Sequence, residues 1–128
     1  MTYDLALTYD WEYDADFIRL IEAAARDRGL ATMTVTPADI GPFLEAFRGG
    51  RVDFRVLVDR AAGASPAFVG LQAEAAERGR EVVDRLEKLR WASDKATMHL
   101  EFLSAGIQTP YTVILPSHAS EPNYPLGP

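Results

Sequence analysis

Short apolar runs alternate with stretches of helical spacing along the first hundred residues. The short runs are rich in branched and aliphatic side chains, which is typical of buried strands. Four runs are predicted strands: 5–9, 31–35, 52–58 and 81–83. Elsewhere apolar side chains recur every three or four positions, which predicts helices. These helices span 14–28, 37–48, 66–78, 86–92 and 94–105.

Residues at the helix ends agree with this division. Asp14 is suited to cap the first helix, and Gly29 to close it. Thr36 and Pro37 supply the cap and the first position of the second helix. Gly41-Pro42 is expected to distort that helix, because proline lacks the donor for an interior hydrogen bond.

The last third of the chain changes character. Ser93 is suited to cap the helix 94–105, whose inward side is expected to carry Met98, Phe102 and Leu103. A fifth strand is predicted at 112–115. Prolines then exclude a helix or a central strand from the tail 116–128.

Strands and helices that alternate through short connections require right-handed crossovers and a parallel sheet. The predicted fold class is therefore α/β. It is a three-layer, half-Rossmann arrangement with a mostly parallel four-stranded sheet, followed by the C-terminal strand and the extended tail. The small residues at 61–65 predict a mobile loop between the third strand and the helix that begins near Pro66.

Composition narrows the class of partner. The chain has 128 residues, 48% of them hydrophobic, which suffices for one substantial core. Its net charge of -6 repels nucleic acids and anionic membrane surfaces. The chain has no cysteine, no signal-like start and no apolar run near the roughly 20 residues of a membrane span. We therefore expect a cytoplasmic protein without nucleic-acid or membrane partners.

Candidate binding residues follow the first and third strands. Asp10 stands between Tyr9 and Trp11 at the carboxyl end of the first strand, where open α/β sheets bind ligands. These three residues are candidates for a substrate rim, although an acidic loop that favours the next helix and aromatic core packing are equally open interpretations. Arg60 ends the third strand, where it can hold a substrate carboxylate or form a structural ion pair. His99 and His118 lack partners at metal-ligand spacing, so no metal site is expected.

A motif near the end of the chain resembles the ATP-grasp superfamily. Asp94-Lys95 opens a helix, and Gly106-Ile107, Pro110 and Thr112 follow in the pattern of the turn that leads into the ATP-binding domain of that family. The resemblance covers residues 1–115, and the nearest members are the ribosomal-protein glutamate ligases and glutathione synthetases. It implies a pre-ATP-grasp domain over 1–92, a helix and strand at 93–115 that lead into a truncated ATP-grasp domain, and the tail 116–128.

The resemblance also implies a division of roles. Lys95 is the implied ATP-binding residue, and Tyr9, Asp10, Trp11 and Arg60 are the implied substrate-binding residues. ATP and Mg²⁺ would serve the complete protein, acting on a small-molecule or peptide substrate. The second ATP-binding lysine, the glycine-rich loop and the magnesium ligands of the family do not follow Pro116, so this chain alone is expected to bind no cofactor and to have no catalytic residue. A homodimer is expected to cover the apolar surface left bare.

Two other function classes stay open. Asp10, Asp59 and Lys95 imitate the order of acidic and basic residues in phosphorylation receiver domains, with Asp59 as the acceptor. That imitation is imperfect, because Lys95 begins a helix rather than ending a strand. The other class is a stand-alone interaction module that uses an exposed apolar surface.

Overall fold

The computed structural model describes residues 1–115, except for the side chains of residues 90–93. The predicted tail 116–128, with His118, lies outside the described residues. The chain divides into two compact units, Met1–Leu89 and Arg90–Pro128. The two are described separately below as the first and the second unit.

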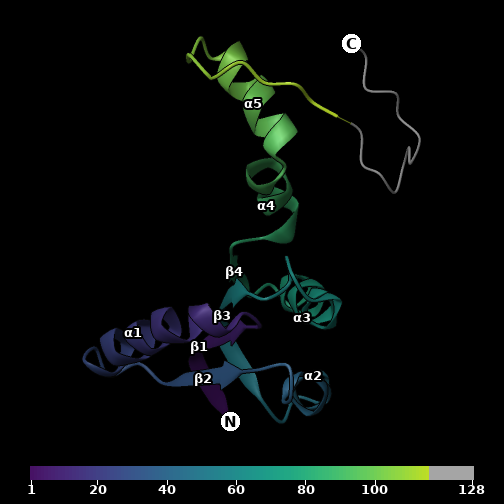
Figure 1. The fold of residues 1–128 in the computed structure, drawn as a ribbon. Coiled ribbons are helices and arrows are strands. Elements are labelled where there is room, and N and C mark those ends of the chain that lie inside the picture. Colours follow the sequence, from purple (N-terminus) through teal and green to yellow (C-terminus); the bar gives the residue numbers. More distant parts are fainter. Residues whose placement is uncertain (116–128) are drawn as a thin grey trace. The chain divides into compact units, whose positions relative to one another are not determined.

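The first unit is a four-stranded parallel sheet with helices on both faces, as Figure 1 shows. Its strands are β1 (Thr2–Tyr9), β2 (Thr32–Val35), β3 (Asp53–Arg60) and β4 (Glu81–Val83), in the spatial order β2-β1-β3-β4. Its helices are the short 3-10 helix η1 (Glu12–Asp14), α1 (Ala15–Arg26), α2 (Ile40–Arg48), α3 (Pro66–Glu77) and the start of α4 (Leu86–Ser93). The predicted α/β class and parallel sheet are confirmed.

Strand order and handedness decide which face each helix covers. The chain moves from β1 outward to β2, then back across β1 to β3 and on to β4. Right-handed crossovers therefore place α1 on one face, and α2 and α3 together on the other. Figure 1 shows this separation, and α2 and α3 contact each other.

The main core lies between the sheet and the pair α2 and α3. Aromatic rings fill it: Phe54 of β3 stacks on Phe47 and Phe43 of α2, with ring centroids 4.5 and 6.2 Å away. Phe68 and Leu71 of α3 are fully buried in the same cluster. Offset aromatic pairs of this kind add to the stability that burial alone provides.

One predicted helix start is corrected, and one predicted cap residue makes a different bond. Helix α2 begins at Ile40, because Thr36 and Asp39 form a separate turn in which the Thr36 hydroxyl donates to the Asp39 carboxylate over 2.5 Å. Pro42 therefore lies in the first helical turn, where N–H groups have no intrahelical partner, and the expected distortion has no physical cause. Asp14 precedes α1 but makes no side-chain cap bond, since its carboxylate binds Arg60 instead. Gly29 does follow α1 with a positive φ of 70°.

The second unit contains α5 (Lys95–Ser104) and an extended segment, and here three expectations were wrong. The cap of α5 is Asp94 rather than Ser93, and its carboxylate accepts from the Thr97 N–H over 3.1 Å. No residue of α5 is buried, and this includes the three that were predicted to face inward. Residues 112–115 form no strand, because a strand needs a neighbouring strand to satisfy its backbone groups.

Within the described part of the chain, none of the helices combines the length and the apolar character that crossing a membrane requires.

Candidate functional site

The sheet changes winding direction between β1 and β3. These strands are neighbours, yet the connection after β1 leads to α1 on one face and the connection after β3 leads to α3 on the other. Ligands of open α/β sheets bind outside the carboxyl ends of the strands at such a switch point. We call the residues there the switch-point edge: Tyr9, Asp10 and Trp11 after β1, and Arg60 to Ser65 after β3.

Arg60 is held at this edge by contacts with α1 and the segment before it. Its Nη2 donates to Oδ1 of Asp14 over 3.0 Å, and its guanidinium lies 5.6 Å from the ring centroid of Phe17. The Asp14 side chain is 10% exposed, whereas that of Arg60 is 40% exposed. The ion pair orients the guanidinium and leaves part of it open to solvent, so the structural and the ligand-binding interpretations of Arg60 are compatible.

The other predicted substrate residues reach the same edge with different exposure. Tyr9 is the register partner of Arg60 and is half-buried. Asp10 is exposed. Trp11 is 59% exposed and meets the ring of Tyr13 edge-on, with centroids 5.0 Å apart. The fold thus places the four residues at one edge, but it pairs Arg60 with Asp14 rather than with any of them.

Asp59 is a buried carboxylate with a full set of donors. It is 2% exposed. Its Oδ1 accepts from the Thr8 hydroxyl at 2.8 Å and from the backbone N–H groups of Ala61 and Ala62 at 2.8 and 3.0 Å. Its Oδ2 accepts from Nε2 of Gln72 at 2.8 Å. These bonds fix the loop that follows β3, and with it the position of the neighbouring Arg60.

The same network continues toward the next helix. Oε1 of Gln72 accepts from the N–H of Leu86, the first residue of α4, over 2.7 Å. A hydrogen-bonded chain therefore joins the end of β1, the end of β3, α3 and the start of α4. Because both Asp59 oxygens are engaged and buried, the carboxylate is poorly placed to attack a phosphoryl donor, and the geometry disfavours a receiver-like role.

A hollow of about 580 Å³ lies within the second unit. Lys95, Met98, His99 and Phe102 line it from one face of α5, since they are spaced three and four residues apart. The following segment completes the lining with Thr109, Pro110 and Thr112.

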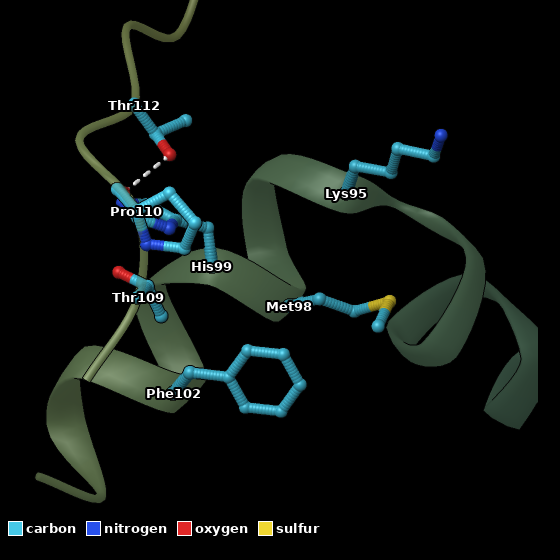
Figure 2. Close-up of a pocket in the computed structure, with 7 residues that line it drawn as sticks. All are labelled: Lys95, Met98, His99, Phe102, Thr109, Pro110 and Thr112. Atoms are coloured by element: carbon cyan, nitrogen blue, oxygen red, sulfur yellow. Dashed lines mark hydrogen bonds between the residues drawn. The ribbon is translucent and has the colours of Figure 1, made fainter. Parts of the chain in front are cut away.

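Figure 2 shows Lys95, Met98 and Phe102 extending to the same side of the helix. The hydroxyl of Thr112 donates to the carbonyl of Pro110 over 2.9 Å. The hollow thus combines a mostly apolar lining with one exposed ammonium group.

The helix N-terminus beside Lys95 is already occupied. The Asp94 carboxylate accepts hydrogen bonds from both the hydroxyl and the N–H of Thr97. These bonds, the hydroxyl first, hold the pKa of Asp94 below its ordinary value. An external anion would therefore meet the charge of Lys95 rather than an open helix end.

Sequence reasoning missed the partners that position the edge. Asp14 was expected to cap the first helix and was not paired with Arg60, and Gln72 has no signal beyond its place in α3. Thr8 offered one weak signal, since it is a polar residue inside an apolar strand.

Among the described side chains, no three of His, Asp and Glu gather into a group that could hold a metal ion.

Comparison with known proteins leaves the family open. No protein family, no curated protein sequence and no solved structure matches the chain.

Proposed function

We propose that this chain contributes the Rossmann-like, substrate-binding domain of an ATP-grasp carboxylate-amine ligase. In this proposal the switch-point edge binds a carboxylate of a small-molecule or peptide substrate, and the hollow beside Lys95 belongs to the ATP site. ATP and Mg²⁺ act in the complete ligase, and we assign no catalytic role to a residue of this chain.

The observation that carries the proposal is the half-exposed guanidinium of Arg60 at the switch point. A charge-assisted pair between arginine and carboxylate offers two parallel hydrogen bonds and fixes the orientation of the ligand. The Asp14 bond and the Phe17 contact hold the arginine in place before a ligand arrives. Preorganisation of this kind lowers the cost of binding.

Lys95 supports the second half of the proposal. Its ammonium is exposed at the first turn of α5, above a hollow with apolar walls from Met98 and Phe102. A nucleotide combines a flat ring, which suits such walls, with phosphates that a lysine attracts as a point charge. The Asp94-Lys95 motif carries the resemblance to the ATP-grasp family, so motif and geometry favour the same ligand.

The test is a pair of titrations of the isotope-labelled chain, followed by NMR. L-Glutamate should shift the amide signals of residues 9–14 and 60–65, and Arg60→Gln should weaken this binding by about tenfold or more, as expected for a lost charged hydrogen bond. Arg55→Gln is the matched control, because Arg55 lies on the same strand, is 76% exposed and pairs with Asp4 at 3.5 Å. Unchanged signals at the strand ends, or equal loss in both variants, would refute the substrate site.

Mg-ATP is the second ligand. It should shift the signals of α5 and of residues 109–112, and Lys95→Gln should weaken the binding several-fold. Lys88→Gln is the control, since Lys88 is the one other lysine of the sequence. A response that does not depend on Lys95 would remove the nucleotide from the proposal.

A further inference from the structure

Helix α1 presents two apolar faces, and the sheet covers one of them. The inner face is buried through Ile18 and Ala25, which are 2% and 4% exposed. A second stripe, which begins one turn earlier in η1, consists of Tyr13, Phe17 and Leu20, and these residues are 71%, 47% and 70% exposed. Their spacing of four and three places them on one side of the helix. An exposed helix of a monomer normally carries polar residues on such a side.

Contacts on the two flanks of α1 show which way this stripe faces. On one flank Glu22 accepts a hydrogen bond from Thr34 of β2. On the other flank Phe17 lies against Arg60 of β3. The stripe is therefore on the flank nearer to β3, beside the part of the sheet that α1 does not cover.

That part of the sheet is also apolar. Val82 of β4 belongs to the core under α3, so Val83 points to the opposite face, the one that α1 shares. Val58 is the register partner of Val83, and Val56 faces the same way two residues earlier on β3. Val83 is 41% exposed and the other two are half-buried. Among the helices of the first unit, α3 packs on β3 and β4, whereas α1 packs mainly on β1 and β2.

We propose that a second copy of this chain covers the surface formed by Tyr13, Phe17 and Leu20 with Val56, Val58 and Val83. We call these six residues the open shelf. We call the valine-bearing face of β3 and β4 the floor. In a two-fold dimer, α1 of each copy packs on the floor of the other copy. This packing buries the stripe on α1 and the three valines in both copies. The proposal does not depend on the ligand at the switch-point edge.

The dimensions of the open shelf favour this occupant. Two neighbouring strands make a floor about 10 Å wide, which equals the diameter of one helix. Each copy thus carries both an uncovered helix and a floor that fits it, which is the self-complementarity that a two-fold interface requires. A partner of another kind would have to supply both features from separate surfaces.

The exposed area is also of the right order. A standard interface buries about 800 Å² per partner, and a buried aromatic side chain contributes about 150–250 Å². Tyr13, Phe17 and Leu20 lie in succession on this side and are each about half exposed or more. Together with the valines they supply most of the area that a stable dimer needs, whereas apolar residues scattered singly would not.

Sedimentation of the whole chain over a wide range of concentration tests the proposal. We expect a species of twice the 14.1 kDa chain mass at high concentration. Leu20→Glu, at the C-terminal end of the stripe, should weaken this association by about a hundredfold, because it places a charge in an apolar interface. Val69→Glu is the matched control, since Val69 is 39% exposed on α3, on the other face of the sheet. A chain that stays monomeric, or equal loss of association in the two variants, would overturn the proposal.

Cross-linking provides a second measurement that does not rely on a damaging substitution. The chain has no cysteine, so a single introduced thiol can form a disulfide only between copies. A mixture of Leu20→Cys and Val83→Cys chains should form disulfide-linked mixed dimers under mild oxidation, and a mixture of Val69→Cys and Val83→Cys chains should not. Cross-linking at Val69 that equals that at Leu20 would show non-specific contact and would contradict the two-fold arrangement.

Discussion

Helices of the first unit and of the described part of the second unit have similar patterns of apolar and polar residues, but only those of the first unit bury their apolar residues. In the first unit, α2 and α3 bury their apolar residues against the sheet, and Phe47, Phe54 and Phe68 are nearly or wholly inaccessible. In the second unit, α5 has the same alternation of apolar and polar positions but buries no residue, and Phe102 is 40% exposed. A pattern of spacing can therefore specify a helix without supplying anything for that helix to pack against.

This difference assigns stability and ligand binding to different parts of the chain. The core of the first unit provides the burial that holds a domain together, because buried apolar area is the dominant favourable contribution to folding. The exposed apolar residues of α5 contribute little to that stability, so they are free to line a hollow beside Lys95. Substitutions in the two regions should therefore have very different effects.

The largest effect is expected for a phenylalanine in each region. Phe54→Ala removes a ring that stacks on two others, and we expect it to lower the free energy of unfolding by about 3–5 kcal/mol. Phe102→Ala removes a partly exposed ring and should change it by no more than about 0.5 kcal/mol. Urea denaturation followed by circular dichroism measures both. Comparable losses would mean that α5 belongs to the cooperative core.

The sequence predicted those elements of the fold that depend on residues close together along the chain. Strand 81–83 matched β4, and the proline at Pro66 correctly opened α3. The predicted strand 112–115 failed because its pairing depends on a neighbour that local pattern does not reveal. The cap at Ser93 failed because Asp94 is an equally good capping residue one position later.

The candidate site was predictable to a lesser degree. Arg60 and Tyr9 were placed at one edge because parallel strands end together, which follows from the fold class. The Asp14 partner of Arg60 lies 46 residues away, and the Gln72 partner of Asp59 lies on another element. Neither pairing follows from composition or spacing, since each depends on the direction of a side chain in the folded chain.

An intermediate effect is expected at the buried carboxylate of the first unit. Asp59→Asn keeps the shape of the side chain but turns one acceptor into a donor that faces other donors. A buried polar group left without its partner costs about 1–3 kcal/mol, and we expect a loss of stability in that range. Asp10→Asn is the exposed control and should change little. Equal stability of the two variants would show that the Asp59 network does not hold the edge together.

The smallest effect is expected at the cap of α5, where no core reinforces the helix. The Thr97 hydrogen bonds lower the pKa of Asp94 from 3.8, so the charged form is favoured when the helix is formed. The stabilisation that the charged Asp94 cap gives to α5 is therefore present above pH 3.8. It is lost as the pH falls through the lower pKa that Asp94 has in the folded state.

The measurement is amide exchange at Thr97 and Met98 as a function of pH, with Asp94→Asn as the control that caps without titrating. We expect the wild-type helix to lose protection in acid relative to Asp94→Asn, while the amides of β1 and β3 keep theirs. Parallel behaviour of the two chains would mean that the cap does not govern α5. Simultaneous loss in the strands would mean that the two units unfold together, which would contradict the separation of stability from binding.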